Sequence, residues 1–264
     1  MNAVYPLSLI CTDFDGTLVD QDPWDRPPDG FFEAVRELRR SGGQWVINTG
    51  RDWHSLCVEL TAREFSEWPD WVVLVEREIH AVRDREIIPW TEWNDRCAAA
   101  HRELFSAKAA LLDRLYEVLR RSVRVSFQIH ADPGSPLAII ADNEVEAERT
   151  HALINEILAE DPGMMVVRNS VYFRFSHPEY NKGTCLNALS KRIGAISEKV
   201  FAIGDHWNDL PMLERSIAHN LACPANGIEA VKKHVRKEGG YVAKGKAGKG
   251  VLEALEHFVR SKQP

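Results

Sequence analysis

Apolar runs and helical stripes alternate along the first third of the chain. Three apolar runs have the length of buried strands: residues 7–11, 44–48 and 71–75. Between the first two, apolar residues at positions 32, 35 and 38 recur at helical spacing, and Asp29 before them can cap a helix. A second helix is expected to begin near Asp52. This strand–helix–strand order predicts a parallel sheet with right-handed crossovers.

The pattern changes between residues 82 and 176. Residues 123–130 alternate strictly between apolar and polar, which is typical of a half-buried strand in an antiparallel sheet. Residues 94–121 predict one long helix or a broken pair of helices, and 78–88 a short hairpin or an irregular passage. The remaining predicted elements of this region are a helix and three strands: 144–159, 137–141, 164–168 and 171–175. We therefore interpret residues 82–176 as an inserted α+β domain.

The parallel-sheet pattern then resumes. A helix is expected after Lys182-Gly183, a strand at 199–203, and a helix that opens at Asn208-Asp209. Further along, a strand candidate and two amphipathic helices complete the chain: 217–222, 227–235 and 250–259. The predicted fold class is α/β, with a Rossmann-like parallel-sheet core formed by residues 1–81 and 177–264, interrupted by the inserted domain.

Composition narrows the function classes. The chain has 264 residues, 44% of them hydrophobic, which is enough for a sizeable core. The formal net charge of -6 lacks the basic footprint of nucleic-acid binding. The 5 cysteines form no Cys-x-x-Cys pair and their number is odd, so neither a disulfide framework nor a zinc site is indicated. Without a signal peptide or a membrane-spanning apolar run, we expect a cytoplasmic protein.

The first candidate site follows the first predicted strand. Asp13 and Asp15 are two residues apart, so in an extended chain they face the same side, at the strand end where α/β sheets bind ligands. Two close carboxylates repel unless a cation or a shared proton intervenes, and oxygen ligands favour Mg²⁺. A solvated turn is the alternative for this Asp- and Gly-containing stretch.

Two further stretches carry groups that suit an anion. Thr49-Gly50-Arg51 lies between a strand end and a helix start, where a hydroxyl and backbone N–H groups can bind anions. A simple helix cap is the alternative there. Lys182 stands at a helix start, where the helix dipole disfavours a cation, so it is either a surface residue or is held for an anion.

A second acidic cluster follows the strand predicted at 199–203. Gly204 permits a tight turn, and Asp205, Asn208 and Asp209 follow it closely. A solvated cap is the alternative, although a second pair of acids at a second strand end is hard to explain by capping. Acids for a metal, a hydroxyl and N–H groups for anionic oxygens, and a lysine are together the parts of a phosphoryl-transfer site.

The order of these stretches resembles the motif order of haloacid dehalogenase-superfamily phosphatases. Four motifs match in sequence: Asp13-Phe14-Asp15-Gly16-Thr17, Thr49-Gly50-Arg51, Lys182-Gly183, and Gly204-Asp205 with Asn208-Asp209. The insertion between the second and third motifs is similar to the α/β cap of the branch that contains Cof-like and sugar-phosphate phosphatases. The resemblance implies a cap domain at 82–176.

The resemblance also implies residue roles. Asp13 would be the nucleophile that forms an aspartyl-phosphate, and Asp15 would protonate the leaving oxygen and then activate water. For Mg²⁺, the implied ligands are carboxylate oxygens of Asp13 and Asp205 and the backbone carbonyl of Asp15. Asp209 would complete the metal site by holding a metal-bound water, or it would orient Lys182. The implied substrate-binding residues are Thr49, Gly50, Arg51, Lys182 and Asn208.

The substrate is expected to be a small phosphorylated metabolite. Residues 69–79, Trp90 and Trp93 are similar to sucrose-phosphate phosphatases, whereas Glu76-Arg77-Glu78 departs from the Asn-Gly of the common Cof-like pattern. A sugar phosphate is therefore the expected substrate. The polar face of residues 123–130 either binds the sugar or is solvated. A phosphomutase and a phospho-accepting signalling module are the alternatives. The sequence leaves a monomer and a homodimer open.

Overall fold

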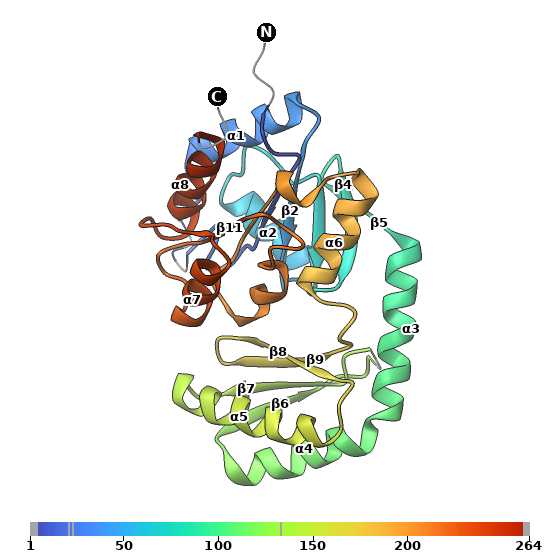
Figure 1. Ribbon diagram of the computed structural model, residues 1–264. Helices are drawn as coiled ribbons and strands as arrows, with labels where there is room; N and C mark the ends of the chain where they lie inside the picture. Colours follow the sequence, from blue (N-terminus) through green and yellow to red (C-terminus); the bar gives the residue numbers. More distant parts are fainter. Residues whose placement is uncertain (1–4, 21, 23, 133, 261–264) are drawn as a thin grey trace. The chain divides into compact units, whose positions relative to one another are not determined.

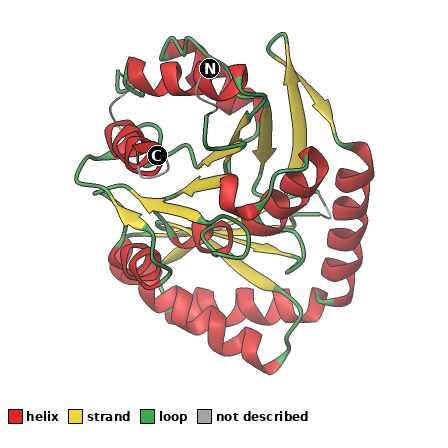
Figure 2. Ribbon diagram, turned by 45° about the horizontal axis from the view of Figure 1, so that its top comes forward, coloured by secondary structure: helices red, strands yellow, loops and turns green. Residues whose placement is uncertain are grey.

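The computed structural model describes residues 5–20, 22, 24–132 and 134–260. The chain forms two compact units, one from Met1–Trp90 with Lys182–Pro264 and the other from Thr91–Asn181. The first carries a mostly parallel sheet and the second an antiparallel sheet, so the predicted α/β fold with an inserted α+β domain is confirmed. Figure 2 distinguishes the helices, strands and loops.

The sheet of the first unit has the order β12-β11-β10-β1-β2-β3-β4-β5 among the described residues. Its strands are β1 (Leu9–Thr12), β2 (Gln44–Asn48), β3 (Trp71–Leu74), β4 (Glu78–Arg83), β5 (Glu86–Pro89), β10 (Val200–Ile203), β11 (Asn220–Cys223) and β12 (Tyr241–Val242). β1 pairs in parallel with β10 on one side and with β2 on the other. The chain runs outward from β1 in both directions, so the carboxyl ends of β10, β1 and β2 form a topological switch point.

The hairpin β4–β5 extends this sheet in the antiparallel sense. Residues 82–89 therefore belong to a hairpin of the first unit, and the predicted boundary at residue 82 falls inside β4. The sequence pattern alone does not distinguish such an extension from the start of an insertion, because both are antiparallel hairpins.

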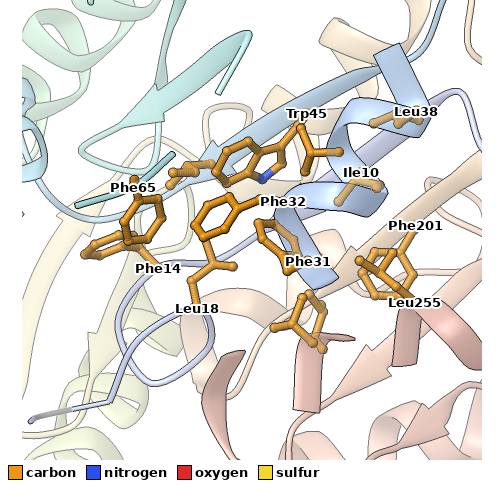
Figure 3. Packing of buried hydrophobic residues seen from close by; sticks show 14 of the residues in the cluster. Ile10, Phe14, Leu18, Phe31, Phe32, Leu38, Trp45, Phe65, Phe201 and Leu255 are labelled. Carbon is orange, nitrogen blue, oxygen red and sulfur yellow. The ribbon is translucent and has the colours of Figure 1, made fainter. Parts of the chain in front are cut away.

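One face of the sheet is covered by α1 (Asp29–Arg40), α2 (Trp53–Ala62) and α8 (Ala247–Arg260). Figure 3 shows Phe31 and Phe32 of α1 beside Trp45 of β2 in this core. α1 and α8 lie side by side in Figure 1. The predicted cap at Asp29 is wrong, because Pro28 is the N-cap residue and Asp29 lies in the first turn. Asp52 does cap α2, since its side chain accepts the N–H of Ser55 at 2.8 Å.

The other face carries α6 (Lys182–Ile193), with η1 (Ser197–Lys199), η2 (Trp207–Met212) and α7 (Glu229–Lys237) following it in the chain. Ile47 joins the core described above, so its neighbour Asn48 points to the opposite face, where its amide donates to the carbonyl of Lys182 at 2.9 Å. The helix predicted to open at Asn208-Asp209 is η2, a 3-10 helix that begins one residue earlier, at Trp207. Pro211 inside it removes a backbone donor.

The second unit has its own core. Its helices and strands are α3 (Thr91–Ala107), α4 (Ala109–Ser122), β6 (Val125–Ile129), β7 (Leu137–Ala141), α5 (Glu144–Glu160), β8 (Met165–Asn169) and β9 (Tyr172–Ser176). The helix predicted at 94–121 is a broken pair, interrupted at Lys108. α4 and α5 lie along one face of the sheet β6-β7-β9-β8 (Figure 1). Their apolar side chains form one buried cluster with those of β7 and β9.

Candidate active site

The first aspartate continues the ladder beyond β1. The N–H of Asp13 donates to the carbonyl of Ile203 at 3.0 Å, which fixes Asp13 at the shared end of β1 and β10. Gly16 follows with φ of 75°, and a Cβ at this position would lie 2.4 Å from Oδ2 of Asp205. Glycine is therefore required for the loop after β1 to approach the acid that follows β10.

Lys182 is the cation of this cluster. It is the first residue of α6 and only 1% exposed, so the surface alternative is wrong. Its Nζ donates to Oδ1 of Asp13 and to Oδ1 of Asp209, both at 2.7 Å. Burial by itself lowers the pKa of Lys182, but the surrounding carboxylates of Asp13, Asp209 and Glu76 outweigh burial and raise it. Lys182 is thus held as a cation.

Asp209 organises the turn after β10. Its Oδ2 accepts the backbone N–H groups of Asp205 at 2.8 Å and of His206 at 2.9 Å, and so caps η2. A Cβ on Gly204 would lie 2.4 Å from Cγ of Asp209, so glycine makes room for this arrangement. One oxygen of Asp209 therefore caps a helix, which was the alternative for this stretch, while the other oxygen accepts a hydrogen bond from Lys182.

Asp13, Asp205 and Asp209 form an acidic cluster that suits a cation. Each contributes a carboxylate oxygen, and these oxygens lie within 4.8 Å of one another. Burial and the charge of Asp209 raise the pKa of Asp13 well above its ordinary value and that of Asp205 to about 7. The Lys182 ammonium leaves part of this negative charge uncompensated, and oxygen donors match the preference of Mg²⁺. The residues present therefore fit a magnesium ion.

Asp15, the second acid of the first motif, is paired with Arg51. The guanidinium donates to both oxygens of Asp15, from Nε at 2.8 Å and from Nη2 at 2.7 Å, and its Nη1 donates to Ser55 Oγ at 2.7 Å. Thr49 is buried, and its hydroxyl accepts the backbone N–H of Arg51 at 3.1 Å. Both predicted substrate ligands therefore make contacts within the protein: Thr49 with the backbone of Arg51, and Arg51 with the carboxylate of Asp15.

Glu76 is a functional candidate that the sequence did not single out as one. It follows β3, is buried, and accepts a hydrogen bond from the amide of Asn208 at 2.7 Å. Thr17 was missed in the same way: its hydroxyl donates to Oδ1 of Asp205 at 2.9 Å. The signals available were the departure at Glu76 from the Asn-Gly pattern and the place of Thr17 within the first motif.

The residues that resemble sucrose-phosphate phosphatases make contacts within the protein. Asp70 accepts the backbone N–H of Trp45 at 2.9 Å and the Nε of Arg39 at 3.1 Å. The guanidinium of Arg192 lies 4.4 Å from the ring centroid of Trp90. Within the second unit, the polar side chains of the β6 region are exposed: Arg124, Gln128 and His130.

Comparison with known proteins decides the family. Residues 122–255, just over half of the chain, match the family of haloacid dehalogenase-like hydrolases. The chain belongs to this family. Together with the acidic cluster, membership makes the protein a haloacid dehalogenase-type phosphatase that acts on phosphorylated small molecules. Among the described residues, none of the helices has the length and apolar character needed to cross a membrane.

Two curated proteins and one solved structure show how far the similarity of this hydrolase extends. A phosphoglycolate phosphatase of Methanopyrus kandleri is 27% identical over 230 residues, covering 86% of this chain and 88% of that protein. A Streptococcus pyogenes protein provisionally named a phosphatase is 23% identical over 273 residues, covering 96% and 98%. The sucrose-phosphatase of Synechocystis sp. PCC6803, solved with sucrose and phosphate, has a TM-score of 0.70 at 18% identity, covering 95% and 97%.

Proposed function

We propose that this hydrolase is a Mg²⁺-dependent phosphomonoesterase that uses Asp13 as its nucleophile and sugar phosphates as its substrates. The observation that carries the proposal is the position of Asp13, whose Oδ1 accepts a hydrogen bond from buried Lys182 at 2.7 Å. A carboxylate oxygen of Asp13 lies within 4.8 Å of carboxylate oxygens of Asp205 and Asp209, at the ligand-binding edge of the sheet.

The reaction has two steps. An oxygen of Asp13 attacks the phosphorus, the bond to the substrate oxygen breaks, and Asp15 gives that oxygen a proton. Water then attacks the phosphorus of the aspartyl-phosphate, Asp15 takes a proton from the water, and the bond to Asp13 breaks. Both oxygens of Asp15 accept hydrogen bonds from Arg51, so Asp15 must leave Arg51 before it can serve the leaving oxygen.

The other residues bind and orient the phosphoryl group. Lys182 supplies a fixed positive charge beside Asp13, and the hydroxyl of Thr49 and the amide of Asn208 supply hydrogen bonds. Asp13 and Asp205 would hold Mg²⁺, with Asp209 orienting Lys182 and the backbone of Asp205. When bound, Mg²⁺ supplies positive charge that offsets the negative charge of the phosphoryl oxygens.

Two relatives point to different substrates. Sugar phosphates are supported by the fold similarity to the Synechocystis enzyme, whose structure contains sucrose and phosphate. The Methanopyrus relative is a phosphoglycolate phosphatase, so phosphoglycolate is the competing substrate. A sugar phosphate carries several hydroxyl groups, whereas phosphoglycolate carries a carboxylate in their place, so one assay panel separates these two classes.

The test is phosphate release from a panel of sugar phosphates, phosphoglycolate and nucleotides, with Mg²⁺ and with a chelator. Asp13→Asn is the active-site variant, and Asp113→Asn is the matched control, because Asp113 lies exposed on α4. We expect metal-dependent release, highest with a sugar phosphate, that Asp13→Asn abolishes and Asp113→Asn retains.

Other outcomes reassign the function. Preference for phosphoglycolate would overturn the substrate class but retain the hydrolase. Conversion of a sugar phosphate into an isomer without release of inorganic phosphate would identify a phosphomutase. A phosphate that stays on the protein for hours would favour a phospho-accepting signalling module.

A further inference from the structure

Glu76 is a buried carboxylate for which the proposed reaction has no role. It is 6% exposed, and Val75 and Glu76 have φ of 44° and 66°, in the left-handed region that residues with side chains rarely adopt. The N–H of Glu76 donates to the carbonyl of Thr49 at 2.9 Å. Backbone strain of this kind is retained where the surrounding structure requires one conformation.

The carboxylate of Glu76 determines the orientation of the Asn208 amide. Oε1 of Glu76 accepts a hydrogen bond from Nδ2 of Asn208 at 2.7 Å. A carboxylate only accepts, so it selects the NH₂ end of the amide. Asn208 is 8% exposed, and its Oδ1 has no hydrogen-bond partner among the described residues. Glu76 therefore fixes one of the two possible orientations of a buried amide in the candidate site.

The charge of Glu76 also acts on the site. With Asp13 and Asp209, it is one of the carboxylates whose charge raises the pKa of Lys182. A negative charge close to Lys182 opposes the binding of another anion there. Substrate and inorganic phosphate are both anions, and a site that binds inorganic phosphate too tightly retains its product.

We propose that Glu76 is a positioning residue for the phosphoryl group, an inference that rests on the proposed phosphatase function. Its carboxylate accepts a hydrogen bond from the Asn208 amide, and its backbone N–H donates to the carbonyl of Thr49. The segments that carry Asn208 and Thr49, both proposed to bind the phosphoryl group, are therefore fixed relative to each other. Its charge weakens the binding of inorganic phosphate. Asn208, Thr49 and Lys182 come from three different segments, and Glu76 acts on each of them.

Two single substitutions separate the hydrogen bond from the charge. In Glu76→Gln, the amide oxygen still accepts from Asn208 while the charge is lost, so we expect inorganic phosphate to bind about tenfold more tightly and to inhibit turnover at a correspondingly lower concentration. In Glu76→Ala, Asn208 loses its partner, so we expect kcat/KM to fall about 10- to 100-fold. Glu78→Gln is the control, because Glu78 lies on β4 with an exposed side chain that faces His80.

A reciprocal exchange distinguishes positioning from a merely structural role. Glu76→Gln combined with Asn208→Asp keeps the net charge and a hydrogen bond between positions 76 and 208, with donor and acceptor exchanged. We expect this double variant to have the melting temperature of the wild type, because the hydrogen bond is kept. We expect it to lose phosphate binding, because the carboxylate at position 208 replaces the amide that faces the anion.

Calorimetric binding of inorganic phosphate provides a readout that does not need turnover. Wild-type phosphate affinity and kcat in the double variant, or an unchanged phosphate affinity in Glu76→Gln, would overturn the inference even if the wild type is a phosphatase. Absence of turnover in the wild type on every panel substrate would instead overturn the proposed function. The two failures are thus separate.

Discussion

At the scale of single residues, Lys182 balances two buried acids. Its ammonium contacts Asp13 and Asp209, and all three residues are almost completely buried. Removing one partner of a buried ionic cluster leaves uncompensated charge, which typically destabilises by about 3–5 kcal/mol. We expect Lys182→Met to lower the free energy of unfolding by this amount and to abolish turnover.

The same variant tests the cation site. Since Lys182→Met leaves the acids without their ammonium, we expect Mg²⁺ to raise its melting temperature more than that of the wild type. Lys191→Met is the control, because Lys191 is an exposed residue in the last turn of the same helix. Equal stabilisation of both variants by Mg²⁺ would contradict a metal site at the acids that Lys182 contacts.

The close approach of Gly204 to Asp209 gives a second prediction for a single residue. A Cβ at this position would lie 2.4 Å from both Cβ and Cγ of Asp209, so Gly204→Ala must displace the carboxylate that caps η2. We expect a loss of about 1–3 kcal/mol in unfolding free energy, together with a lower kcat. Gly42→Ala is the matched control: Gly42 has φ of 80° with no atom within 4 Å of its Cβ position, so backbone strain lowers stability while kcat is retained.

At the scale of elements, α5 carries a histidine whose protonation opposes folding. His151 packs against Phe173 of β9 with 6.1 Å between ring centroids. Burial, and then the charge of Arg168, lower the pKa of His151, while Glu148 opposes them. Histidine in the unfolded chain has a pKa of about 6.5, so below this pH the unfolded state binds more protons than the folded state. The stability contribution of neutral His151 is therefore present above pH of about 6.5 and is lost as the pH falls.

Unfolding by urea at several pH values between about 5 and 8 measures this effect. We expect His151→Gln to flatten the decline of unfolding free energy on the acid side, because glutamine does not titrate. His54→Gln is the control, since His54 is an exposed residue of α2. A decline as steep in His151→Gln as in the wild type would contradict the assignment.

The elements also show what the sequence could predict. Hydrophobic periodicity located β1, β2, β10 and the antiparallel strands, because buried strands need apolar runs or alternation. It could not place the hairpin β4–β5 in the first unit, since that depends on pairing with β3. It brought the acids together at strand ends, but it did not predict the contact between Asn208 and Glu76, because hydrophobic periodicity does not report the left-handed backbone at Val75 and Glu76 that precedes this contact.

At the scale of the whole molecule, the candidate site and the second core lie in different units. Every residue of the acidic cluster belongs to the first unit, whereas the cluster of buried residues around Leu115 and Phe173 belongs to the second. A ligand stabilises the part of a protein whose folded form binds it, by about 2.7 kcal/mol at a concentration of 100 times Kd. Mg²⁺ should therefore stabilise the first unit selectively.

Hydrogen exchange with and without Mg²⁺ tests this expectation, because local opening is reported segment by segment. We expect slower exchange in residues 9–17 and 200–209, which carry the acids, and unchanged exchange in β7 and β9 of the second unit. Asp205→Asn is the control, since loss of one carboxylate should remove the effect of Mg²⁺ without altering the second core. Equal slowing in β7 and β9 would show that the two units respond to the cation as one cooperative body.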